Sequence, residues 1–129
     1  EFVKTLGHYH PAEHGELYIV LEGKAIYLMQ KIDKEGKIED IYAVEADKGD
    51  HVIVPPGYGH ITINPGDEEL KMANWVAEFK SIYEPIVEKG GGGYFYTDNG
   101  WVRNDNYGTV PDLRMEVAGD SMPEDLSFL

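Results

Sequence analysis

Three histidines and one glutamate occupy positions from which their side chains could bind a single divalent metal ion. His8 and His10 are two residues apart, and on a strand this spacing places both imidazoles on one face. Glu16 begins the next apolar run, and His60 follows the proline-glycine turn at 55–57. Imidazole nitrogens and a carboxylate oxygen suit iron, manganese, zinc, nickel or cobalt. Because these four ligands leave coordination positions open, such a site could be catalytic.

Other histidines and acids near these positions are weaker candidates for metal ligands. Glu13 is the main rival to Glu16 because it also lies close to His10, but it stands in a loop rather than at the start of a strand. His14 and His51 have no matching spacing, so we expect them to face solvent or to support the ligands. A single His-X-His pair is common by chance, and the prediction therefore depends on the spacing of all four residues together.

Apolar runs separated by turn residues predict strands along most of the chain. The expected strands cover residues 16–22, 25–31, 38–46, 51–54, 60–64, 70–79, 94–97 and 101–103. We expect the stretch 70–79, the longest apolar one, to be a central strand, and the last two strands to form a hairpin around Asp98-Asn-Gly100. Residues 83–89 allow a helical turn or two, which Pro85 keeps short. This spacing of strands and turns predicts an all-β, antiparallel sandwich or barrel.

Length, charge and composition exclude several classes of protein. The chain has 129 residues, enough for one domain, and 24 acidic against 11 basic residues give a formal net charge of −13. Nucleic acids and anionic membranes are therefore disfavoured as partners, because both are bound through positive charge. The absence of cysteine excludes disulfides, thiolate ligands and cysteine nucleophiles, and we expect a cytoplasmic protein. Because the chain starts at Glu1 and reaches its richest motif within ten residues, we expect a longer parent protein.

Two segments of the chain resemble the two conserved motifs of the cupin superfamily. The second motif is matched at every position, by Gly49, Pro55, Gly57, His60 and Asn64. The first is matched by His8, His10, Glu16 and Gly23, with a slightly long gap before the glutamate and with Phe2 in place of the upstream glycine. The resemblance implies a small antiparallel jelly-roll barrel with the metal inside its mouth. We expect this cupin barrel domain to cover residues 1–105, without some upstream strands, and residues 106–129 to form a C-terminal tail.

Residues 3–90 also resemble one cupin family, the archaeal-type phosphoglucose isomerases. The similarity lies in the runs Thr5-Leu-Gly-His-Tyr-His-Pro11 and Glu16-Leu-Tyr18, in Val54-Pro-Pro56 before His60, and in Tyr83 before Glu88-Lys-Gly90. The chain departs from the family in two places. The gap between His10 and Glu16 is one residue shorter than expected, and Ser81 stands where a substrate-contacting histidine is expected.

This resemblance implies a role for each matching residue. The implied metal ligands are His8, His10, Glu16 and His60. Thr5 and Gly7 are expected to contact a sugar phosphate, and Tyr18 and Tyr83 to line the sugar pocket. The implied reaction interconverts glucose 6-phosphate and fructose 6-phosphate, with Glu16 as general base. We expect one divalent ion per subunit, Fe²⁺ with Mn²⁺, Zn²⁺, Ni²⁺ and Co²⁺ as alternatives, and a homodimer.

Other functions share part of this pattern and stay open. A cupin dioxygenase that uses Fe(II) and oxygen would have the same four ligands but an apolar or aromatic substrate pocket. A non-enzymatic sugar- or metal-binding cupin would keep the barrel without a positioned base, and a β domain could hold these histidines for structure alone. The run from Thr5 to His10 and the position of Tyr18 favour the isomerase. The residues do not decide between proton transfer through Glu16 and a hydride shift between carbons.

Overall fold

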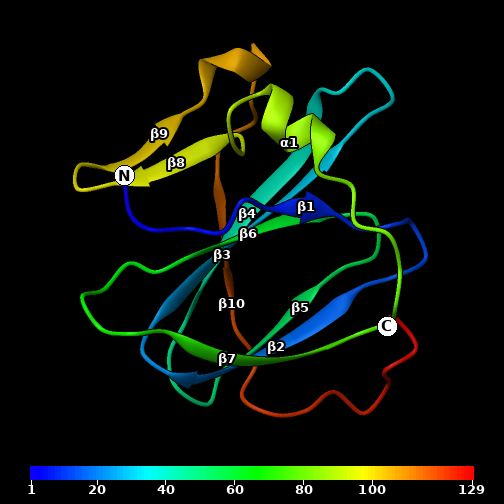
Figure 1. Ribbon diagram of the computed structural model, residues 1–129, viewed down its shortest axis with the longest axis vertical. Coiled ribbons are helices and arrows are strands. Elements are labelled where there is room, and N and C mark those ends of the chain that lie inside the picture. The colour runs from blue at the N-terminus through cyan, green and yellow to red at the C-terminus, as the bar shows by residue number, and fades with distance from the viewer.

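The chain forms ten β-strands and two short helices in the computed structural model, which describes residues 1–129 (Figure 1). The strands are β1 (His8–Tyr9), β2 (Glu16–Glu22), β3 (Ala25–Ile32), β4 (Ile38–Ala46), β5 (His51–Val54), β6 (Gly59–Ile63), β7 (Lys71–Val76), β8 (Tyr94–Thr97), β9 (Gly100–Arg103) and β10 (Arg114–Val117). The α-helix α1 (Glu84–Glu88) and the 3-10 helix η1 (Asp105–Tyr107) complete the set. The predicted hairpin and short helix are confirmed. Neither helix has the length and apolar character that crossing a membrane requires.

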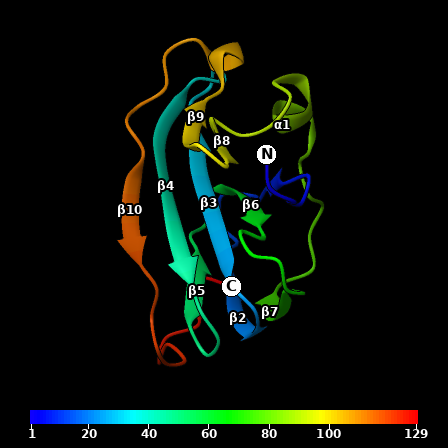
Figure 2. The ribbon, with the colours of Figure 1, turned by 90° about the vertical axis from the view of Figure 1, so that its left-hand side faces the viewer.

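Two sheets form the body of the molecule. One has the strand order β1-β6-β3-β4-β10, the other has the order β5-β2-β7, and the hairpin β8–β9 is a separate ribbon. All neighbouring strands are antiparallel except β10, which runs parallel to β4. Figure 2 shows β3 and β4 as the long strands, with β10 beside β4 and with β2 and β7 on the side away from β10. The predicted all-β, antiparallel fold class is confirmed.

The central strand β3 is buried on both faces, which explains its nearly continuous apolar sequence. Successive side chains of a strand point to opposite faces of the sheet. Tyr27 therefore packs with Val52 of β5 in the core between the two sheets. Leu28 points the other way, into a second core that Ile86 of α1 and Tyr94 of β8 cover. The helix and the hairpin thus close the outer face of the larger sheet, at the upper end of Figure 1.

The prediction of a central strand at 70–79 is wrong. The strand is limited to Lys71–Val76 and lies at the edge of its sheet, where it pairs only with β2. Trp75 and Val76 are 41% and 43% exposed. The apolar composition that suggested burial on both faces instead gives an edge strand with exposed apolar side chains.

Residues after 105 are attached to both sheets. The strand β10 extends the larger sheet, and Gly119 forms an antiparallel bridge with His51 of β5. Near the C-terminus, the amide of Gly15 donates a hydrogen bond to the carbonyl of Phe128, next to the start of β2. The division of the chain at residue 105 stays a prediction.

Candidate metal centre

The four predicted metal ligands face one interior point because three neighbouring segments converge there. The strands β1 and β6 pair with His8 directly opposite His60. His10 follows β1, and its amide donates to the carbonyl of Tyr58, in the turn that precedes His60, over 3.4 Å. Glu16 is the first residue of β2 in the facing sheet. The cluster is therefore built by the pairing of β1 with β6 and by the approach of the second sheet.

The spacing of the ligand atoms fits a bound divalent ion. The Nε2 atoms of His8, His10 and His60 lie 3.0–3.2 Å from one another. Oε1 of Glu16 lies 3.2 Å from Nε2 of His10 and 3.3 Å from Nε2 of His60. Ligand atoms about 2.1 Å from a shared ion stand about 3 Å apart when their bonds meet at right angles. These four residues could therefore hold a metal ion together.

Aromatic side chains pack against the buried imidazoles, whose Nδ1 atoms have no hydrogen bond. The ring of His10 lies 4.7 Å from the ring of Phe79, and that of His60 lies 5.6 Å from the ring of Tyr18. The Nδ1 atoms of His10 and His60 are buried and have no hydrogen-bond partner in the protein. Each ring thus presents Nε2 to the common point through the shape of its surroundings.

The electrostatics of the cluster favour the deprotonated, ligand-ready forms. Burial, and then the neighbouring imidazoles of His60 and His10, lower the pKa of His8 from 6.5 to about 4. Burial alone would raise the pKa of Glu16, but hydrogen bonds with His10 and His60, the charge of His60 and a hydrogen bond from Asn74 together hold it well below its usual range. Glu16 is therefore a carboxylate, and His8 a neutral imidazole, at neutral pH.

Asn74 is a site residue that the sequence did not reveal. Its Nδ2 donates a hydrogen bond to Oε2 of Glu16 over 2.7 Å, whereas Oε1 faces the imidazoles of His10 and His60. The contact exists because β7 pairs with β2 in a register that places Asn74 opposite Tyr18. The only local signal was an amide in the run 72–77, whose other residues are apolar.

A cavity of about 280 Å³ adjoins the cluster, and all four predicted substrate-binding residues line it. The cavity is lined by Thr5, Leu6, Gly7, His8, Tyr18, His60, Thr62, Met72 and Tyr83. Of the predicted ligands, His8 and His60 form part of its wall. Leu6 lies within the predicted motif but was given no role, and Thr62 and Met72 were not predicted, since they reach the cavity through strand pairing.

The segment before the first histidine is held tightly against β6. The amide of Thr5 donates to the carbonyl of Thr62 over 2.9 Å, and the hydroxyl of Thr5 accepts from the amide of Thr62 over 3.0 Å. Gly7 has a φ of 87°, and a Cβ there would lie 2.5 Å from Cγ1 of Ile61. This close approach requires glycine. It brings the backbone of 5–7 to the cavity wall.

Two tyrosines lie beside the imidazoles on the cavity side. The ring of Tyr83 lies 5.4 Å from His8 in an edge-on arrangement, and Tyr18 lies 5.0 Å from Tyr27. Burial, and then the negative charge of Glu16, raise the pKa of Tyr18. The hydroxyl of Tyr18 therefore stays protonated and can donate a hydrogen bond.

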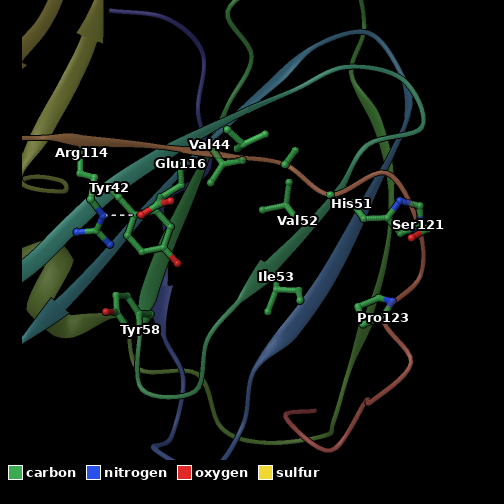
Figure 3. Close-up of a pocket in the computed structure, with 13 residues that line it drawn as sticks. Tyr42, Val44, His51, Val52, Ile53, Tyr58, Arg114, Glu116, Ser121 and Pro123 are labelled. Atoms are coloured by element: carbon green, nitrogen blue, oxygen red, sulfur yellow. Dashed lines mark hydrogen bonds and ion pairs between the residues drawn. The ribbon is translucent and has the colours of Figure 1, made fainter.

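The weaker candidates lie outside the cluster. Glu13 is exposed, and His14 stacks on Phe79 at 5.6 Å, so His14 supports the packing around His10. His51 lines a separate cavity of about 400 Å³ between β4, β5 and β10 (Figure 3). This cavity is roomier than the one beside the cluster but holds none of the four ligands. The smaller cavity is the one that adjoins the cluster.

Two facing antiparallel sheets bring three imidazoles and a carboxylate to one interior point, a cupin-like arrangement that could hold a metal ion. The family model described as glucose-6-phosphate isomerase matches residues 1–112. Among relatives named glucose-6-phosphate isomerase, that of Thermococcus litoralis is 36% identical over 104 residues, which are 79% of this chain and 52% of the relative. That of Pyrococcus horikoshii is 34% identical over 105 residues, 80% of this chain and 53% of the relative. The chain therefore belongs to the glucose-6-phosphate isomerase family, as the motifs predicted, and spans about half the length of these curated relatives.

Proposed function

We propose that this chain carries the active centre of a metal-dependent isomerase that interconverts glucose 6-phosphate and fructose 6-phosphate. The observation that carries the proposal is that the cavity is lined both by residues of the cluster and by the predicted substrate-binding residues. Two of the four metal ligands, His8 and His60, line the same cavity as Thr5, Gly7, Tyr18 and Tyr83. A sugar phosphate in this cavity would have its reactive end at the cluster and its hydroxyls against polar side chains.

The reaction moves one hydrogen between C1 and C2 of the sugar and one proton between their oxygens. When bound by His8, His10, Glu16 and His60, a divalent ion supplies polarisation of the substrate carbonyl. In the proton-transfer route, Glu16 takes the proton from one carbon and returns it to the other. In the alternative route, the hydrogen passes directly between the carbons as a hydride, and Glu16 acts only as a ligand.

The substrate would be held by hydroxyl and backbone groups rather than by a basic patch. The threonine hydroxyl of Thr5 and the backbone around Gly7 suit a phosphate group, which amides bind well. The hydroxyls of Tyr18 and Tyr83 suit sugar oxygens, while their rings suit the apolar faces of the sugar. An iron dioxygenase would need a more apolar cavity, and the two threonines and two tyrosines here favour the sugar.

We also propose Fe²⁺ as the ion, a homodimer as the assembly and the cytoplasm as the location. Three imidazoles and one carboxylate suit Fe²⁺ without excluding Mn²⁺, Zn²⁺, Ni²⁺ or Co²⁺. A substrate that carries a phosphate charge does not cross membranes freely, which supports a location inside the cell.

A coupled assay of fructose 6-phosphate conversion tests the function directly. We expect turnover by the metal-loaded chain, loss of turnover in a chelator, and recovery when Fe²⁺ or another divalent ion is restored. Metal-loaded protein that converts no fructose 6-phosphate would favour the non-enzymatic sugar-binding cupin or the dioxygenase.

The substitution Glu16→Gln separates the two routes of hydrogen transfer. The amide oxygen can still bind a metal ion but cannot accept a proton, so turnover should fall by roughly 10²–10⁴-fold if Glu16 is the base. Metal content, measured by elemental analysis, should stay near that of the unchanged chain. Glu13→Gln is the matched control, because this exposed acid lies outside the cluster, and it should leave both readouts unchanged. Undiminished turnover in metal-loaded Glu16→Gln would instead support the hydride shift.

A further inference from the structure

We infer that Asn74 is a positioning residue that makes Glu16 bind the metal ion through one oxygen only. The inference rests on the proposed metal-dependent function and concerns how many coordination positions are left for substrate. The two carboxylate oxygens of Glu16 have different partners. Oε1 faces Nε2 of His10 and Nε2 of His60, at 3.2 and 3.3 Å. Oε2 accepts the hydrogen bond from Asn74 at 2.7 Å.

The burial of Glu16 and the pairing of its strand stabilise the hydrogen bond from Asn74 to Oε2 of Glu16. The side chain of Glu16 is 4% exposed, and a buried carboxylate oxygen without a partner is costly. A hydrogen bond to a charged acceptor is stronger than a neutral one. The pairing of β2 with β7 fixes the distance between the two residues, because Glu16 and Asn74 lie on adjacent strands of the same sheet. Oε2 is therefore engaged by the protein before any ion arrives.

The consequence is a fixed number of protein ligands. A carboxylate can bind a metal ion through one oxygen or through both. With Oε2 held by Asn74, the protein supplies three imidazole nitrogens and one carboxylate oxygen. A six-coordinate ion then keeps two positions for small molecules, whereas a carboxylate bound through both oxygens would leave one. Two free positions would let adjacent oxygens of a sugar bind together, which suits a reaction at two neighbouring carbons.

The test counts water molecules on bound Mn²⁺. Water-proton relaxation in a solution of the Mn²⁺-loaded chain rises with the number of exchangeable waters on the ion, and electron paramagnetic resonance measures the free ion. We expect Asn74→Ala to lower the contribution of the bound ion to the water-proton relaxation rate to about half of its value in the unchanged chain. The reason is that Oε2 then takes one of the two water positions on a six-coordinate ion. Asn74 is exposed, so the substitution should leave the fold intact, and circular dichroism checks this. Asn74→Leu, which also lacks the donor, provides a second variant.

The control is Asn64→Ala, whose amide donates to the carbonyl of Glu68 in a loop away from the cluster. This variant should show the same relaxation as the unchanged chain. The inference would be overturned if bound Mn²⁺ contributed as much or more to water-proton relaxation in both Asn74 variants as in the unchanged chain. Failure of the unchanged chain to bind Mn²⁺, Fe²⁺ or Co²⁺ would instead overturn the proposed metal centre, and the two failures are thus distinguishable.

Discussion

Protons and metal ions compete for the same nitrogen of each imidazole in the cluster. The surroundings of His8 weaken its binding of a proton, because burial and the adjacent rings of His60 and His10 lower the pKa of His8 to about 4. Hydrogen bonds to Glu16 keep the pKa of that carboxyl below its usual range. Both shifts keep the site in the form that a cation needs, and both make the folded state sensitive to acid.

We expect the metal-free chain to lose stability as the pH falls below about 6.5. Between pH 6.5 and 4, unfolded His8 holds a proton that folded His8 does not, so the free energy of unfolding decreases as the pH falls through this window. Below about pH 4.5 the lowered pKa of Glu16 acts in the same direction, because the unfolded carboxyl is protonated first. Calorimetry in a chelator measures the midpoint temperature at each pH. His8→Gln, which cannot titrate, should reduce the slope between pH 6.5 and 4, and equal slopes in both proteins would contradict the expectation.

At the scale of strands and turns, the sequence predicted those features of the site that depend only on the local geometry of the backbone. The two-residue spacing of His8 and His10, and the turn before His60, follow from strand alternation and from proline and glycine. The start of β2 at Glu16 follows from an apolar run. These features were sufficient to predict the four residues that the structure brings together.

Strand order and register could not be predicted, because they depend on contacts between distant segments. The edge position of β7 is one example, since its apolar run is equally compatible with a central strand. Asn74 is another, because its approach to Glu16 requires the β2–β7 register. Likewise, Thr62 reaches the cavity only through the pairing of the segment at Thr5 with β6.

The strand β10 should be the least protected strand of the larger sheet. All four of its residues are exposed, and only β4 pairs with it. Arg114 holds it in place by donating to the carboxylate of Asp40 and by lying 4.7 Å from the ring centre of Tyr42. Such exposed ion pairs contribute up to about 1 kcal/mol, so Arg114→Ala should speed amide exchange in β10 by up to about fivefold.

Hydrogen exchange followed by mass spectrometry measures this difference, with the peptides of β3 as the internal reference. Lys31→Ala is the matched control, because it removes an exposed pair with Glu39, between β3 and β4, and should leave β10 unchanged. Exchange in β10 as slow as in β3 would contradict the expectation.

At the scale of the whole molecule, the smaller sheet ends in the edge strand β7, which carries exposed apolar side chains. The outer edge of β7 has no neighbour in the chain, and Trp75 on this strand is 41% exposed. Open strand edges pair readily with other chains unless charge or cover prevents it. Val3, at 79% exposure, is a further exposed apolar residue, whereas Phe2 stacks on Tyr96.

We therefore predict a two-fold homodimer whose interface includes β7. In such an assembly the same surface of each copy meets the other, so one substitution changes the interface twice. Trp75→Lys should convert a dimer to a monomer of 14.5 kDa, because a charge at a strand edge opposes pairing. Val117→Lys is the matched control, since Val117 is an apolar residue with 95% exposure on β10, the edge strand of the other sheet. Sedimentation equilibrium at micromolar concentrations measures the mass. A monomeric unchanged chain would contradict the dimer, and dissociation by Val117→Lys but not by Trp75→Lys would move the interface to β10.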